Sequence, residues 1–235
     1  MATKPDFETS ADKNIKLKGV VARQTSLTNQ VTRLLRESIL SGQLKPGERL
    51  VERSLAKSLQ VGQSTVREAM QVLEHEGLIL KRANKGSTVT RLSSQEAKEI
   101  VDIRMDLEPK AFILAHRKMN AEHFRKLEGM VRRIDDRANH NDYYGVSQND
   151  FIFHKTVWNI SQNYMLERIL NYICTPLFAY LTVLPRNDLR GRVKSHSILL
   201  DHLRDGDERA LAQAVRDHLT NAWVPLVGPD EMQET

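Results

Sequence analysis

Residues 44–77, LKPGERLVERSLAKSLQVGQSTVREAMQVLEHEG, decide the fold of the N-terminal part of this 235-residue chain. The spacing of the apolar residues predicts two short helices joined by a tight turn at Val61-Gly62. The inward-facing residues of these helices are Leu55, Ala56, Leu59, Val66, Ala69, Met70 and Leu73. Small polar residues open the second helix, and this is the end that a recognition helix places in the major groove of DNA. Spacing alone also fits an ordinary helical hairpin.

The sequence on either side favours the DNA-binding interpretation. A helical period covers residues 27–43, so a further helix precedes the pair. Gly77 is placed to end the second helix. Two short strands, Leu78–Arg82 and Ser87–Arg91, are then predicted around a turn, and they carry several basic residues. Three helices followed by such a hairpin predict a winged helix-turn-helix with a small β wing.

This region resembles the DNA-binding domain of GntR-type transcription regulators. The resemblance lies in LTNQVTRLLRESILSGQLKPGERLVERSLAKSLQVG followed by STVREAMQVLEHEGLI, and it extends over residues 27–91. It implies that the residues touching DNA are Arg53, Gln63, Ser64, Thr65, Arg67, Lys85 and Gly86. Many relatives have arginine in place of Gln63 and proline in place of Thr65. Since glutamine suits adenine and arginine suits guanine, no consensus operator carries over.

Charge is distributed unevenly along the chain. Residues 1–93 hold 16 Lys and Arg against 9 Asp and Glu, a net charge of +7, whereas the remainder holds 19 against 21, a net charge of −2. A basic front and a slightly acidic back indicate that only the front meets a polyanion such as DNA.

Composition limits the remaining possibilities. The single cysteine, Cys174, excludes an intramolecular disulfide and favours a reducing compartment, so we expect a cytoplasmic protein associated with the nucleoid. No apolar run has the length of a membrane span, and the polar first 25 residues are unlike a secretory signal. The expected parts are a flexible N-terminal arm at 1–25, the winged helix-turn-helix at 26–92, an all-α domain at 93–225 and a C-terminal tail at 226–235.

The second part of the chain has a helical period throughout. A capping box begins at Ser93, and the predicted helices cover residues 94–117, 121–139, 143–161, 164–183, 188–205 and 207–223. Further N-caps are predicted at Asn120, Asp142 and Asp207, a C-cap at Gly206, and breaks or kinks at Pro176 and Pro185. We therefore expect an all-α bundle of six or seven helices.

Four polar residues on inward helix faces form a candidate metal site. Asp150 and His154 are four residues apart, so they share one helix face and lie about 6 Å apart along the axis. His196 and His218 lie among apolar residues on two later helices. A single such histidine is usually a hydrogen-bonded core residue. Three histidines and a carboxylate on inward faces instead favour a divalent cation, which satisfies all four together.

The segments NDFIFH at 149–154, SHSILLDHLRDGDERA at 195–210 and DHL at 217–219 resemble the ligand-binding domain of the FadR-like branch of the family. The resemblance implies a metal held by Asp150, His154, His196 and His218. Zn is the first expectation for this donor set, with Ni, Mn and Fe as alternatives. Within the branch, a short chain with six helices is more similar to the vanillate-regulator type.

Arg104 interrupts the apolar stripe of the first helix of the bundle. A buried arginine needs an anion, and its planar fork matches a carboxylate. One interpretation is that Arg104 and the metal together bind an organic acid, and the other is a salt bridge to Glu108, one turn further on.

These features predict a homodimeric, ligand-responsive transcription regulator, in the commoner family mode a repressor. It would bind an inverted repeat in double-stranded DNA and respond to a small carboxylate effector. The alternatives are a DNA-binding regulator with a purely structural metal and no small effector, and a metal-dependent hydrolase.

Overall fold

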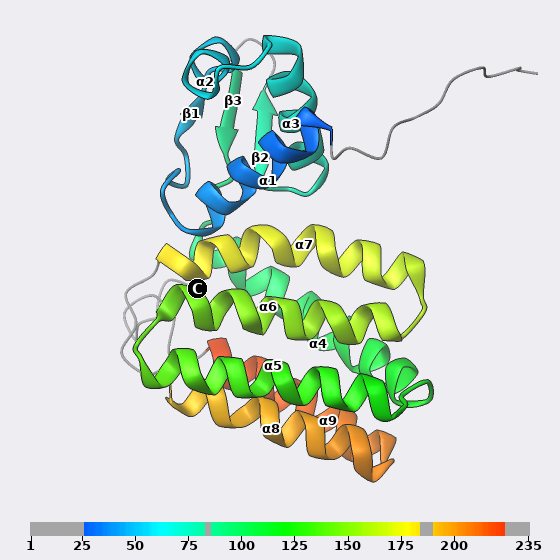
Figure 1. Cartoon of the computed structure of the whole chain (residues 1–235). Helices are drawn as coiled ribbons and strands as arrows, with labels where there is room; N and C mark the ends of the chain where they lie inside the picture. Colours follow the sequence, from blue (N-terminus) through cyan, green and yellow to red (C-terminus); the bar gives the residue numbers. More distant parts are fainter. Residues whose placement is uncertain (1–25, 83–85, 184–189, 224–235) are drawn as a thin grey trace, which may run out of the picture.

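The computed structural model describes residues 26–82, 86–183 and 190–223, which form two parts stacked on one another (Figure 1). The elements from α1 to β3 form a small winged domain, and the helices from α4 to α9 form a larger helical bundle. The fold class predicted from the sequence is confirmed. None of the helices in the described ranges is both long and apolar enough to cross a membrane.

The winged domain contains three helices and a three-stranded sheet. In chain order its elements are α1 (Leu27–Leu40), β1 (Arg49–Leu50), α2 (Glu52–Leu59), α3 (Gln63–His75), β2 (Ile79–Arg82) and β3 (Gly86–Val89). Its core is built mainly by α1 and α3. The buried residues that these two helices contribute are Val31, Leu35, Ile39, Val66, Ala69, Met70 and Leu73. This inner face is the one that the helical spacing predicts for α3.

The wing is an antiparallel sheet with strand order β1-β3-β2. Ile79 pairs with Val89 across the hairpin, and Arg49 pairs with Thr88 on the other side of β3. The two hairpin strands agree with the prediction to within two residues at each end. The third strand, β1, is not predicted, because two residues have no measurable period and this strand exists only through its pairing with β3.

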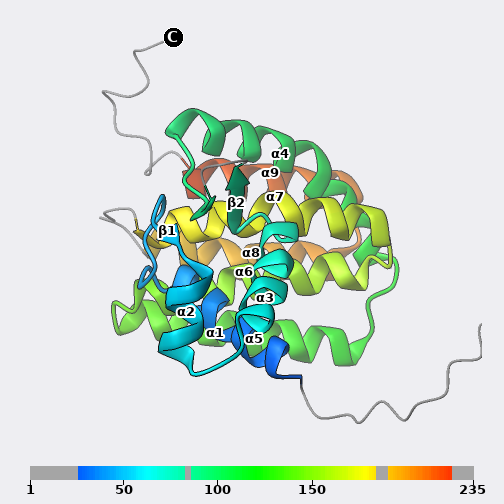
Figure 2. The ribbon, with the colours of Figure 1, turned by 90° about the horizontal axis from the view of Figure 1, so that it is seen from above.

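The bundle has six helices within the described residues. They are α4 (Ser94–His116), α5 (Ala121–Asn139), α6 (Tyr143–Ile160), α7 (Tyr164–Val183), α8 (Arg190–Asp205) and α9 (Glu208–Trp223). In Figure 1, α7 lies directly beneath the winged domain, and α6, α5 and α8 follow away from it. Helices α4 and α9 pack against each other on the far side of this layer (Figures 1 and 2).

Local signals fix most helix ends of the bundle. Ser93 and Glu96 form the predicted capping box. The side chains of Asn120, Asp142 and Asp207 accept backbone N–H bonds at the starts of α5, α6 and α9. A break or a kink was predicted at Pro176, and no break occurs there: α7 runs through this residue to Val183, as the predicted helix at 164–183 does. Its buried neighbours, including Leu177 and Phe178, hold the helix in place despite the missing hydrogen bond. Pro185 lies outside the described residues.

Helix α7 belongs to the bundle but also packs against the winged domain. Ala179 is buried in the same apolar cluster as the core of the winged domain. The backbone of Gly77, at the end of α3, passes so close to α7 that an added Cβ would lie 3.1 Å from the Tyr172 carbonyl oxygen. The two parts therefore share a packed contact (Figure 2).

Candidate metal centre and nucleic-acid interface

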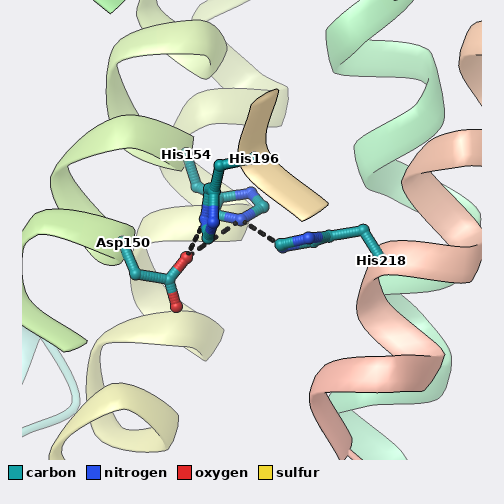
Figure 3. Close-up of side chains that lie close together, drawn as sticks. All are labelled: Asp150, His154, His196 and His218. Atoms are coloured by element: carbon teal, nitrogen blue, oxygen red, sulfur yellow. Dashed lines mark hydrogen bonds and ion pairs between the residues drawn. The ribbon is translucent and has the colours of Figure 1, made fainter. Parts of the chain in front are cut away.

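The structure brings the four predicted metal ligands together in the middle of the bundle. Asp150 and His154 come from α6, His196 from α8 and His218 from α9. One ligand atom from each lies within 4.8 Å of all the others. Figure 3 shows the carboxylate and the three imidazole rings pointing toward a common centre.

The distances within this cluster suit a metal ion. Asp150 Oδ1 lies 2.7 Å from His196 Nε2 and 3.3 Å from His154 Nε2, and the Nε2 atoms of His154 and His218 are 3.0 Å apart. Neighbouring ligands on a metal with bonds of about 2.1 Å lie roughly 3 to 3.5 Å apart. The contacts at 3.0 and 3.3 Å have the spacing of ligands sharing one ion, and the contact at 2.7 Å between Asp150 and His196 is that of a hydrogen bond.

The cluster is also buried, which makes its polar atoms costly to leave without partners. His154, His196 and His218 are at most 5% exposed. Two facing imidazole nitrogens share a single hydrogen bond, whereas both can donate lone pairs to a cation. The residues present therefore fit a divalent metal.

The electrostatics of the cluster combine burial with strong mutual interactions. Burial acts to raise the pKa of Asp150, but the charge of His196 and hydrogen bonds from the histidines bring this pKa well below its ordinary value. Burial and the neighbouring charges of His196 and His154 hold the pKa of His218 well below its ordinary value. A carboxylate that stays ionised and an imidazole that stays neutral are the forms that bind metals.

The predicted DNA contacts lie on one end of the winged domain. Arg53 is exposed on α2, and Gln63, Ser64 and Arg67 are exposed on the first two turns of α3. Thr65 is half-buried beside them, and the wing residue Gly86 is exposed. Lys85 lies outside the described residues. The polar opening of α3 is thus free of the core, as a recognition helix requires.

Comparison with known proteins places this architecture in a family. The FCD domain matches residues 99–221, and the domain described as "Bacterial regulatory proteins, gntR family" matches residues 27–89. The HTH-type transcriptional regulator YdhC of Bacillus subtilis is 30% identical over 192 residues, which cover 79% of this chain and 82% of YdhC. The chain belongs to the GntR family. Within it, the FCD domain marks the FadR-like branch, so the chain is a transcription regulator.

Two further GntR-family relatives extend the comparison. The gluconate operon transcriptional repressor of Bacillus licheniformis is 28% identical over 169 residues, covering 72% of this chain and 69% of the repressor. The solved structure of Escherichia coli McbR/YncC matches with a TM-score of 0.75 at 22% identity, over 86% of this chain and 98% of that chain. At this identity the likeness to McbR/YncC shows the fold alone.

In this GntR-family chain, Arg104 is paired within the bundle. Its Nε donates to Glu108 Oε1 at 2.5 Å, and both side chains are almost completely buried. This is the salt bridge that one of the two sequence interpretations anticipated. An effector contact by Arg104 stays a prediction.

The sequence reasoning missed two contacts that acidic residues make at these sites. Glu108 contacts His154 as well as Arg104, and its Oε2 lies 2.7 Å from His154 Nδ1. Glu52, at the start of α2, accepts hydrogen bonds from both Gln63 and Arg67. The four-residue spacing reveals the contact of Glu108 with Arg104, but both missed contacts join different helices and carry no periodic signal.

Proposed function

We propose that this chain is a homodimeric repressor whose operator binding is relieved by a small organic acid at a divalent metal. The metal, with Zn as the first expectation, would be held by Asp150, His154, His196 and His218. The observation that carries the proposal is the convergence of these four ligand atoms within 4.8 Å in a buried site. The name of the gluconate operon repressor, a relative, supports both the repressor mode and an acid-linked role.

A pocket beside the cluster supports a small ligand. It has a volume of about 440 Å³, lies between α8 and α9, and is lined by His218 together with Ser195 and His202. His218 is the proposed ligand that lines this pocket, so a carboxylate bound here would lie beside the metal centre. The proposed effector class is therefore a small carboxylate.

The switch would act by shifting a population between two arrangements of the winged domains. Each recognition helix reads one half of an inverted repeat, so the spacing between the two helices in a dimer decides operator affinity. An effector changes this equilibrium only by as much as its affinities for the two arrangements differ, and about 1.4 kcal/mol gives tenfold. The protein would act in the cytoplasm, on DNA.

Elemental analysis of purified protein, combined with native mass spectrometry, tests the metal centre. We expect about one transition metal per chain in the wild-type protein and loss of that metal in His196→Ala. His140→Ala is the control, because His140 is exposed just after α5 and lies outside the cluster. An equal metal content in all three proteins would contradict the assigned ligands.

Operator binding tests the rest of the proposal. Once a bound DNA fragment is selected, Arg67→Ala should weaken binding by about 1–3 kcal/mol if Arg67 contacts a base. Small carboxylates should release the metal-loaded protein from this fragment and leave the His196→Ala protein bound.

The alternative is a structural metal without an effector, which the deep burial of the ligands favours. It predicts that metal removal unfolds the bundle and that no acid changes operator affinity.

A further inference from the structure

A buried carboxylate lies on the outer side of the candidate metal centre. Glu108, on α4, is 0% exposed and comes from a different helix than any of the four proposed ligands. Its Oε2 is 2.7 Å from His154 Nδ1, and its Oε1 accepts the hydrogen bond from Arg104 Nε. The two oxygens of one carboxylate therefore serve two different partners.

This contact settles which nitrogen of His154 faces the centre. Nδ1 is bound to the carboxylate, while Nε2 lies 3.0 Å from His218 Nε2 and 3.3 Å from Asp150 Oδ1. An imidazole whose Nδ1 donates a proton to a carboxylate keeps the Nε2 lone pair for a metal, and the carboxylate increases the basicity of that nitrogen.

We propose that Glu108 is a positioning residue of the metal centre, which fixes the tautomer and ring orientation of His154 so that Nε2 binds the ion. The inference rests on the proposed metal function. Glu108 is not itself a ligand in this arrangement, because its carboxylate lies on the opposite edge of the imidazole ring from the cluster.

Glu108 gives His154 a distinct position among the three histidines. His218 Nδ1 is bonded to the hydroxyl of Ser195 at 2.8 Å, and His196 Nδ1 has no partner within the described residues. Only His154 has a carboxylate on its outer nitrogen in the described part of the chain. His154 is therefore the most strongly oriented of the three and the strongest electron donor to the ion.

Arg104 holds the carboxylate in place. Its guanidinium binds Glu108 Oε1 and lies 5.3 Å from the centre of the Phe178 ring, so it is fixed by contacts on two helices. A carboxylate anchored through one oxygen cannot swing across the imidazole to replace Asp150 as a ligand. The contacts thus run in one order, from Arg104 to Glu108 to His154, and the guanidinium of Arg104 lies at the end farther from the proposed metal.

The first test uses the wild-type protein loaded with Zn. Long-range ¹H–¹⁵N NMR spectra distinguish protonated, hydrogen-bonded and metal-bound ring nitrogens. We expect the signals of His154 to show a protonated Nδ1 and a metal-bound Nε2. A metal-bound Nδ1, or a Nδ1 without a proton, would overturn the assignment of Glu108.

The second test measures Zn affinity by competition with a chelator in Glu108→Gln. Glutamine has the same size but a single acceptor oxygen, so it cannot accept hydrogen bonds from both His154 Nδ1 and Arg104 Nε. One of these two donors would face the NH₂ group of the amide. The contact that orients His154 should therefore be weakened. The expected decrease in affinity is about 10- to 100-fold. Glu99→Gln makes the same change at an exposed position of the same helix and should leave the affinity unchanged.

A double variant separates positioning from a general structural effect. If Glu108 acts through His154, Glu108→Gln should lower Zn affinity no further once His154→Ala has removed that ligand. Equal losses in the two backgrounds would overturn the proposal. Absence of Zn from the wild-type protein would refute the metal function itself, whereas normal Zn binding with an unchanged Glu108→Gln affinity would refute only the role of Glu108. If Glu108→Gln does not fold, the wild-type spectra decide.

Discussion

Arg104 shows how one buried side chain restricts the changes that its neighbours tolerate. It is 5% exposed, and its cation faces the completely buried carboxylate of Glu108. In the metal-free protein, burial acts to raise the pKa of Glu108, but the charges of Arg104 and of protonated His154 bring this pKa down to about 2. The pair is therefore ionised at neutral pH, and each charge depends on the other.

Arg104→Ala should destabilise the metal-free protein by about 3–5 kcal/mol, because it leaves a buried carboxylate without its cation. Urea denaturation measures this loss. Adding Glu108→Gln to Arg104→Ala should recover part of it, since the unpaired charge is removed as well. Arg117→Ala is the control: it breaks an exposed pair with Glu208, which solvent screens, and should change the stability far less than Arg104→Ala. Additive losses at positions 104 and 108 would contradict this account.

Glu52 restrains the residues predicted to read DNA. The hydrogen bond from Arg67 lowers the pKa of Glu52, against the smaller effect of burial. A carboxyl whose pKa is lowered in the folded state stabilises the fold above its unfolded value of 4.5, and this contribution is lost as the pH falls through the folded value. The pair therefore persists at neutral pH and opens only in acid.

An NMR titration of the side-chain carboxyl carbons checks the Glu52 interaction. The midpoint of Glu52 should lie below 4.5 in the wild-type protein and should rise toward that value in Arg67→Ala. Glu208, whose pKa is lowered by Arg117 at the other end of the molecule, should titrate identically in both proteins. A Glu52 midpoint that does not respond to Arg67→Ala would show that the contact is absent in solution.

At the scale of single elements, the start of α6 combines a cap with a glycine. The Asp142 carboxylate accepts a hydrogen bond from the Gly145 N–H and forms an ion pair with Arg137. A Cβ at position 145 would overlap this carboxylate, since it would lie 2.8 Å from Asp142 Cγ. Glycine is thus required here by the close approach of the cap to the helix.

Gly145→Ala should therefore destabilise the protein by about 1 kcal/mol or more, because the Asp142 cap must move away. Thermal denaturation compares it with Gly129→Ala in the middle of α5, where a Cβ meets only flexible arginine ends at 3.7 Å or beyond. There the same substitution should stabilise the helix by about 1 kcal/mol. A stabilising Gly145→Ala would show that the cap is not formed.

Element boundaries were predictable where a local signal marks them and unpredictable where pairing or packing decides. The caps at Ser93, Asn120 and Asp142 and the helical periods located the bundle helices to within about two residues at most ends. Strand β1 depends on pairing with β3, which is distant in the sequence, so no local signal revealed it.

The same distinction applies to the candidate metal centre. Asp150 and His154 are linked by the helical period, and His196 and His218 were added by their inward faces and by family resemblance. The contact between Glu108 and His154 joins residues 46 positions apart on two helices. Only the packing of α4 against α6 creates it, and that packing angle has no signature in the sequence.

At the scale of the whole molecule, Gly77 lies where the two parts of the chain meet. Its φ is +74°, and an added Cβ would approach the Tyr172 carbonyl of α7. Gly47 has a similar φ of +82°, but a Cβ there would meet only the side chain of Arg91 at an ordinary 3.7 Å. The two glycines share the backbone requirement and differ in the contact with α7.

Gly47→Ala should cost about 1–2 kcal/mol through backbone strain alone, and Gly77→Ala should cost more because it also pushes against α7. Thermal denaturation gives the two stabilities. Gly77→Ala should in addition change operator affinity or effector response, which the Gly47→Ala protein retains. If the two variants have the same stability, operator affinity and effector response, the contact of Gly77 with α7 does not couple the winged domain to the bundle.

Because Ala179 of α7 is buried among residues of the winged domain, the apparent boundary between the two parts is not a place where the chain can be exchanged freely. In a hybrid regulator that joins this N-terminal part to another sensor domain at residues 90–93, a different α7 would pack against the same apolar residues of the winged domain. Such chimaeras should work only when the incoming helix carries a side chain as small as alanine at this point. Domain exchange between such regulators is therefore limited to pairs whose α7 fits the core of the other protein's winged domain.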